Sequence, residues 1–328
     1  MEKASETLRD RNQRWNHPAA HAGDKGGSDM PGPKDRFPNP FLPKAPWNGL
    51  EQFREPLCYE LKGRAFQLVM DNGHAYALHF LSEEMIAWGE QGKALRWNTY
   101  ECLKLDDVTY FVNWEVFGAP LRTCLTLVLD LKADLVTAVY AQIGAVKTCP
   151  YLVTNEIIFG AIKAPGKPLN TMRHAYTPDL VGRNIFWRYS SNFGITHAFI
   201  TEHFLRVPIG QPRELPPDAS PEEIAERDKE YERRKQHLFE IPAFYIKIRE
   251  DVYFFGFIEE TECRLDPTLC GNSLIMVMDT NKIHDVGRCF ASDYENHYAP
   301  QNFVFSAFGA FHDTPDLIDG MPSPYRIF

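Results

Sequence analysis

The 328-residue sequence contains no run of about 18 apolar residues, the length that a helix needs to cross a bilayer. Its N-terminal stretch is charged and has no apolar segment of the kind found in secretory signals. We therefore expect a cytoplasmic protein without a membrane partner. The 35 Lys and Arg residues are outnumbered by 44 Asp and Glu residues, a formal net charge of -9 that disfavours nucleic acid as a partner.

Common motifs for nucleotides, hydrolysis and metals are also absent. The sequence has no P-loop, no Gly-x-Gly-x-x-Gly after a strand and no Gly-x-Ser-x-Gly. It has no His-x-His, His-Glu-x-x-His or Cys-x-x-Cys, and His197 and His203 would lie roughly 20 Å apart along a strand. We expect no metal and no cofactor. The seven cysteines are odd in number and lie mostly in apolar runs, as free buried thiols do.

The residues that are present favour β-structure. Hydrophobic residues make up 44% of the chain and aromatic residues 13%, and from about residue 59 the apolar residues alternate with period two. Alternating runs at 65–70 and 74–80 flank Asn72-Gly73, which predicts a hairpin with a type I′ turn. Further hairpins are expected over 95–115 and 123–140.

The second half of the chain repeats the order of the first. Leu61-Lys-Gly-Arg64 recurs as Leu180-Val-Gly-Arg183, and Leu127-Val-Leu-Asp130 recurs as Met276-Val-Met-Asp279. The first hairpin turn recurs at 190–194, and Asp107–Trp114 recurs as Asp251–Phe257. A tandem duplication of an all-β module explains this order.

Short antiparallel strands without interleaved helices predict closed barrels, which have no exposed edges. We predict an all-β fold of tandem calycin/lipocalin-like antiparallel barrels. The first barrel is expected over residues 49–160 and the second over 170–315, after an extended, partly disordered arm at 1–48. Ser220-Pro-Glu-Glu223 is a capping box that predicts a solvated helical insertion over about 220–238 of the second barrel. The sequence leaves open whether this helix is a lid over the barrel mouth or only a surface decoration.

The order of these short motifs resembles the MoaF family. The resemblance rests on Gly63–Phe66, Asp71–Gly73 with Tyr76, Arg96-Trp97, Tyr110–Trp114 and Leu127–Asp130. It covers about residues 50–312 and implies two calycin-like barrels, whereas the molybdenum-cofactor label of the family name is not taken as a function.

The same elements are similar to phenolic acid decarboxylases, single barrels that act on hydroxycinnamic acids without a cofactor. That family's two pocket tyrosines fall here on Leu68 and Met70 in the first module, and on Trp187 and Tyr189 in the second. The family's arginine is kept as Arg96. Its glutamate falls on Val116 in the first module and on Glu259 in the second, so neither module has the full set.

The second module contains the candidate catalytic residues. By strand parity, Ile185, Trp187 and Tyr189 share one face with His197 and Phe199 of the next strand. Glu259 would face the same lumen, two residues beyond Phe257. If this face points inward, Tyr189, His197 and Glu259 form an acid-base set whose carboxyl pKa burial would raise, while Trp187, Phe199 and Phe257 wall the pocket. Ordinary filling of the barrel, or an outward polar face, is the alternative.

The first module offers binding residues. Arg96 beside Trp97 could hold a carboxylate or enolate, or pair with an acidic neighbour at a strand edge. Tyr76 and Trp114 are expected to line the same barrel, although aromatic stripes are usually packing. In the second module, Tyr245 is a candidate binding residue, but it alternates with Lys247 and Arg249, which favours solvent exposure for all three.

Three functions fit these patterns. The first is a cofactor-independent enzyme of the lyase, decarboxylase, isomerase or cyclase type that acts by proton transfer on a small apolar or aromatic molecule, in secondary metabolism. The second is a non-catalytic lipocalin-like binding protein for such a molecule. The third is an interaction scaffold. The oligomeric state is open, and a homodimer is one possibility.

Overall fold

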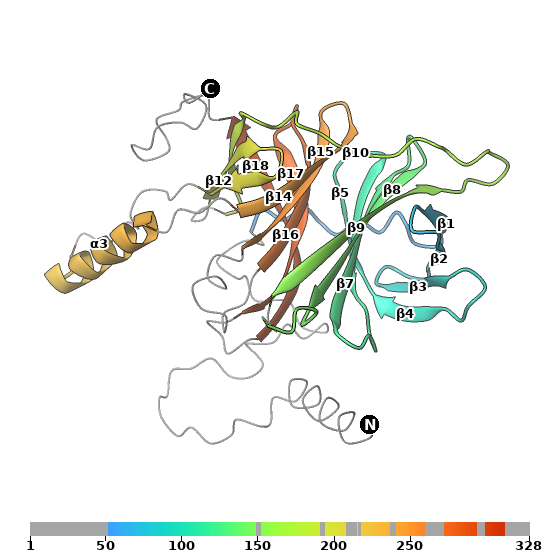
Figure 1. The fold of residues 1–328 in the computed structure, drawn as a ribbon, viewed down its shortest axis with the longest axis horizontal. Helices are drawn as coiled ribbons and strands as arrows, with labels where there is room; N and C mark the ends of the chain where they lie inside the picture. The colour runs from blue at the N-terminus through green and yellow to red at the C-terminus, as the bar shows by residue number, and fades with distance from the viewer. Residues whose placement is uncertain are drawn as a thin grey trace, which may run out of the picture. The chain divides into compact units, whose positions relative to one another are not determined.

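The computed structural model describes residues 52–148, 152–190, 194–207, 215, 218–236, 241–259, 272–293 and 299–311. The predicted arm at 1–48 lies outside these ranges, as do Cys149, Cys263 and Cys270. The described part of the chain is built almost wholly from antiparallel strands, with one long helix (Figure 1). The all-β expectation is confirmed.

The first half forms a nine-stranded antiparallel sheet in the order β4-β3-β2-β1-β9-β8-β7-β6-β5. Its two end strands, β4 and β5, are separated in sequence by Tyr100 alone, so one bent strand pairs with β3 and then with β6. The bent strand closes the sheet into a barrel. The strands are β1 (Ala65–Met70), β2 (Ala75–Phe80), β3 (Met85–Glu90), β4 (Arg96–Thr99), β5 (Glu101–Lys104), β6 (Thr109–Glu115), β7 (Arg122–Asp130), β8 (Leu135–Ile143) and β9 (Val153–Ile162).

The second half repeats this arrangement. Its sheet has the order β10-β14-β13-β12-β11-β18-β17-β16-β15, and a further pairing of β14 with β15 closes the ring, while β10 only flanks β14. The strands are β10 (Ala175–Tyr176), β11 (Asn184–Arg188), β12 (Gly194–Thr201), β13 (Phe204–Arg206), β14 (Ile241–Arg249), β15 (Val252–Glu259), β16 (Asn272–Asp279), β17 (His284–Asp293) and β18 (Ala299–Phe311).

The internal repeat extends to single hydrogen bonds. At the start of each barrel a glycine adopts a positive φ, +77° at Gly63 and +90° at Gly182. The Gly63 amide donates to the Phe80 carbonyl at 2.7 Å, and the Gly182 amide donates to the Phe199 carbonyl at 2.9 Å. Because both glycines make the same turn and bond to the same position of the second strand, the duplication read from the sequence is a structural one.

The first hairpin turn differs from our expectation. A type I′ turn needs positive φ at both central residues, but only Gly73 has it, at +86°, and Asn72 does not. The Gly73 amide donates to the Met70 carbonyl at 3.1 Å, and the Met70 amide donates to the His74 carbonyl at 2.9 Å. The connection is therefore a longer hairpin loop that needs left-handed backbone at the glycine alone. The equivalent turn at 191–193 lies outside the described residues.

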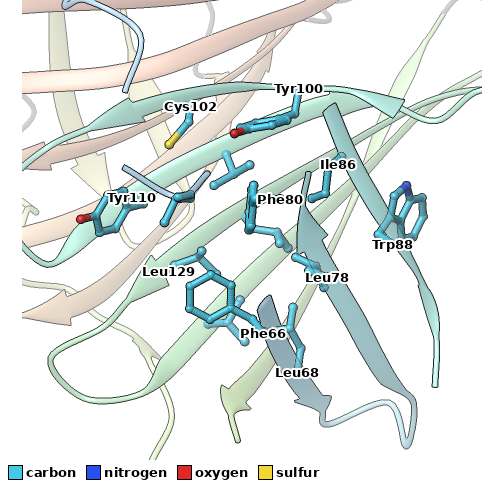
Figure 2. Packing of buried hydrophobic residues seen from close by; sticks show 14 of the residues in the cluster. Phe66, Leu68, Leu78, Phe80, Ile86, Trp88, Tyr100, Cys102, Tyr110 and Leu129 are labelled. Atoms are coloured by element: carbon cyan, nitrogen blue, oxygen red, sulfur yellow. The ribbon is translucent and has the colours of Figure 1, made fainter. Parts of the chain in front are cut away.

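Apolar residues of alternate parity fill the inside of each barrel. In the first barrel, the Phe80 ring lies between Phe66 and Tyr100, with ring centroids 5.9 Å and 5.0 Å away (Figure 2). Phe66, Phe80, Tyr100 and Tyr110 pack one end of the lumen, whereas Leu68, Leu78 and Trp88 lie toward the other end (Figure 2).

The outer faces of the two barrels pack against each other within Pro46–Phe328, which forms one compact unit. This second core explains why several strands are apolar on both faces rather than on one. Its buried members are Leu103, Leu105, Phe111, Val128 and Val139 from the first barrel and Ile246, Ile248, Val252, Phe254, Ile275, Val277, Val286 and Val304 from the second.

Helix α3 (Pro221–Gln236) interrupts the second barrel between β13 and β14. The predicted capping box is present, because the Ser220 amide donates to Glu223 Oε2 at 2.8 Å and the Glu223 amide donates to Ser220 Oγ at 3.2 Å. Most side chains of its first half are exposed, as predicted for a solvated helix. No helix in the described ranges is both long and apolar enough to span a membrane.

Candidate functional site

The first barrel contains a cavity at the Trp88 end of its lumen. The cavity volume is about 60 Å³, and about 450 Å³ when all the space between the lining atoms, including the part open to solvent, is counted. Four aromatic residues and seven aliphatic ones line it, as is typical of sites for small organic molecules. The lining residues are Leu68, Met70, Tyr76, Leu78, Trp88, Trp114, Leu125, Leu127, Ala138, Tyr140 and Ile158.

Strand register brings these side chains together. Trp114 of β6 is paired with Leu125 of β7, which is paired with Tyr140 of β8, so these three lie in one row on the inner face. Tyr76 of β2 stands opposite Leu68 of β1. The cavity thus draws its walls from strands far apart in the sequence.

The indole rings of Trp88 and Trp114 meet edge to face, with centroids 5.4 Å apart, and the Tyr76 ring lies 6.5 Å from Trp88. The two indole nitrogens differ in their partners. Trp88 Nε1 donates to Asn98 Oδ1 at 2.8 Å. Trp114 is 2% exposed, and its Nε1 has no hydrogen-bond partner among the described residues.

Carboxylates lie close to the phenol of Tyr76. Burial raises the pKa of Tyr76, and the negative charges of Glu90 and Glu156 add to the effect. Glu90 stands opposite Tyr76 on β3 and accepts from Lys93 Nζ, and it lies 3.2 Å from His74 Nδ1. The bond from Lys93 is the largest cause of the lowered pKa of Glu90. The Tyr76 phenol therefore stays protonated near neutral pH.

The second barrel has bulkier side chains at the equivalent positions. Counted from the shared Leu-x-Gly-Arg start, Leu68 corresponds to Trp187, Met70 to Tyr189 and Leu78 to His197. These three residues of the second barrel are 0%, 3% and 1% exposed. At these positions the second barrel thus has two large rings and an imidazole where the first has two leucines and a methionine.

Residues 47–145 match the MoaF N-terminal domain family. This segment contains most of the strands of the first barrel, and all the lining residues except Ile158 fall within it. Over this segment the first barrel matches a MoaF N-terminal domain. Comparison with curated proteins gives no match. The similarity to phenolic acid decarboxylases stays a prediction.

Beyond the MoaF domain, the second barrel brings most of its predicted site residues to one inner face. Ile185 pairs with His197, and Trp187, Tyr189 and Phe199 belong to the same buried cluster as Phe257. The His197 ring lies 5.2 Å from Phe257 and 6.5 Å from Phe199, centroid to centroid. Glu259 ends β15 opposite Asn272, and only its backbone is described.

Desolvation dominates the electrostatics of this second lumen. Burial lowers the pKa of His197 to about 3, so the imidazole is neutral at physiological pH. His197 Nδ1 and Trp187 Nε1 have no hydrogen-bond partners within the described ranges. Within that part of the chain, no group of three His, Cys, Asp or Glu side chains is placed to hold a metal ion.

The expected exposure of Tyr245 is wrong. We expected solvent exposure, but Tyr245 is 1% exposed, and its hydroxyl donates to the Phe204 carbonyl at 2.7 Å. The inner face of β14 thus includes Tyr245, whose ring lies 5.3 Å from Phe199. Lys247 reaches the rim instead, where its Nζ lies 2.9 Å from Asp179 Oδ2. Parity was read correctly, but the side of the strand that faces the lumen was not.

The four predicted binding residues of the MoaF domain divide into two pairs. Tyr76 and Trp114 line the cavity. Arg96 pairs with Trp88 across β3 and β4 and is exposed, and Trp97 is 67% exposed on the neighbouring position. A binding role for Arg96 and Trp97 stays a prediction.

Two lining rings were missed by the sequence reasoning, Trp88 and Tyr140. The alternation Val136, Ala138, Tyr140 carries a usable signal for the second, because all three share one strand face. Nothing in the local pattern of 85–90 separates Trp88 from a packing residue.

Proposed function

We propose that this protein binds a small, largely apolar molecule in the cavity of its MoaF N-terminal domain. One observation carries the proposal: duplicated barrels with the same strand order differ at the same lumen positions, Leu68 against Trp187 and Met70 against Tyr189. An apolar cavity in the barrel with the smaller side chains at these positions is consistent with a ligand site.

The expected affinity is modest. A one-ring or two-ring ligand that buries about 200 Å² of apolar surface gains roughly 5 kcal/mol at about 25 cal/mol per Å². Association and the ordering of the ligand reduce that gain. Dissociation constants of about 0.2 mM or weaker are therefore expected for simple aromatic probes.

Leu68→Trp tests the site by copying the second barrel into the first. The new indole should occupy the cavity and weaken the binding of aromatic probes at least about tenfold, since the cavity volume is lost. Binding is measured by tryptophan fluorescence and calorimetry across a panel of small aromatic molecules. Leu81→Trp is the matched control, because Leu81 is 50% exposed and does not line the cavity. Binding that survives Leu68→Trp unchanged contradicts the proposal.

We keep a second proposal, a cofactor-independent lyase or isomerase that uses Tyr189, His197 and Glu259 of the second barrel. Its support is the shared inner face and the unpartnered His197 Nδ1. A neutral imidazole of low pKa is a weak base, so Tyr189 would be the proton donor. Product analysis of the same panel tests it: turnover that Tyr189→Phe abolishes and Leu68→Trp leaves intact supports this enzyme, and binding without turnover refutes it.

A further inference from the structure

The polar lumen residues of the two barrels are distributed unequally. One cross-strand row in the first barrel consists of Trp114, Leu125, Tyr140 and Glu156. The equivalent row of the second barrel, set by the shared Leu-x-x-x-x-Asp spacing on β7 and β16, consists of Phe257, Leu274, Cys289 and Phe303. An indole N–H, a phenol and a carboxylate therefore occur in this row of the first barrel and not in the equivalent row of the second.

Within this row, Trp114 Nε1 is the buried donor without an acceptor among the described residues. A buried N–H that leaves water without gaining an acceptor is unfavourable, and such groups in native proteins call for an explanation. Trp88, the ring beside it, meets this requirement through Asn98. Trp114 is one of the cavity's lining residues, so a bound molecule that reaches the N–H edge of its indole would supply the missing acceptor.

Charge at the cavity limits what that acceptor can be. Glu156 stands opposite Tyr140 and is exposed, and Glu90 stands opposite Tyr76. Glu90 is paired with Lys93, and Arg96, across from Trp88, is exposed and does not line the cavity. An anionic ligand would approach Glu156 without a cation among the lining residues, whereas an uncharged oxygen would not be repelled.

Building on the proposed function, we infer that the ligand of the first barrel carries an uncharged oxygen acceptor of the carbonyl class, which accepts a hydrogen bond from Trp114 Nε1. Its apolar body lies among Leu68, Leu78 and Leu127. The hydroxyls of Tyr76 and Tyr140 are further donors for the same end of the molecule. The ligand class is then an aryl or alkyl ketone, aldehyde or amide rather than a carboxylate or a hydrocarbon.

Acetophenone and ethylbenzene test this inference, because they share a shape and differ in the carbonyl. The readout is the ratio of their affinities, measured by calorimetry for wild type, Trp114→Phe and Trp88→Phe. In Trp114→Phe the preference for acetophenone over ethylbenzene should fall by about tenfold, since the substitution removes the donor while keeping a ring. Trp88→Phe is the matched control: it should weaken both ligands alike, because the Trp88 N–H is bound to Asn98.

Failure of the inference is distinguishable from failure of the proposed function. If both ligands bind wild type and Trp114→Phe leaves their ratio unchanged, the carbonyl inference is wrong and the binding site stands. If neither ligand nor any other panel member binds wild type, the proposed function is wrong. Should Trp114→Phe fail to fold, the indole N–H proton resonance of Trp114 in wild type decides: acetophenone should shift it downfield and ethylbenzene should not.

Discussion

Arg288 of the second barrel donates a hydrogen bond from Nε to Thr126 Oγ1 of the first barrel at 3.2 Å, and both residues are buried. Its Nη1 also donates to the carbonyl and the hydroxyl of Ser273, at 2.6 and 2.8 Å. A guanidinium thus lies inside the contact between the barrels, where burial lowers its pKa.

Arg288→Ala should destabilise the protein by about 3 to 5 kcal/mol, because it leaves buried partners unpaired and opens a cavity. Arg288→Met should lose less stability than Arg288→Ala, since methionine keeps most of the volume and removes the charge. Urea unfolding measures both, and Arg96→Ala, at an exposed arginine, is the control, with a change within about 0.5 kcal/mol. Equal losses for Arg288→Ala and Arg96→Ala would show that the buried guanidinium contributes nothing specific.

The buried carboxyl of Asp285 should make the stability of the protein depend on pH. Its carboxyl is fully buried, with Oδ1 accepting from the Ala307 amide at 2.8 Å, and burial raises its pKa well above the usual value. The folded state therefore favours the protonated acid. The stability that this protonated carboxyl contributes is lost as the pH rises above about 4, the pKa of aspartate in the unfolded chain. Asp285→Asn, which cannot ionise, should become more stable than wild type as the pH rises from 4.5 to 8. Parallel stability curves of the two proteins would contradict this assignment.

Cys58 should be the most reactive thiol among the described cysteines. A hydrogen bond from the Cys102 thiol is the main cause that lowers the pKa of Cys58 to about 6, with a further bond from the Glu60 backbone. The alkylation rate with iodoacetamide should reach half its maximum near pH 6. Cys102→Ala should move that midpoint up, toward the ordinary value near 9. Cys124, whose pKa burial raises to about 11, is the internal control and should stay unmodified. A midpoint for Cys58 that Cys102→Ala leaves unmoved refutes the pairing.

Gly160 should be sensitive to added volume at the seam where β1 meets β9. A Cβ there would lie 2.6 Å from Met70 Sδ and 2.7 Å from the Val69 carbonyl oxygen. Gly160→Ala should therefore destabilise by about 2 to 3 kcal/mol, because the strands must separate. At Gly63 the added Cβ meets nothing within 4 Å, and only its φ of +77° is unfavourable, so Gly63→Ala should lose about 1 kcal/mol. Thermal or urea unfolding of both variants ranks them, and the reverse order would contradict this account.

Much of the fold could be predicted because its signals are local. Alternation along 65–80 placed β1 and β2, and the Ser220 capping box placed the start of α3. The Leu-x-Gly-Arg repeat predicted that each barrel starts with the same turn. That Trp187, Tyr189 and His197 share a face also followed from parity, since strand geometry alone assigns neighbours to one face.

The sequence by itself determined the strand period, the duplication and the residues that share a face. Only the tertiary structure decided that the first barrel contains a cavity, that Tyr245 faces inward and that Tyr140 joins Trp114 in one row. The physical reason is that a cavity depends on the summed volumes of side chains from strands far apart in the chain. Leu68 leaves space and Trp187 fills it, but that difference has meaning only once closure of the barrel has set the distance to the opposite wall.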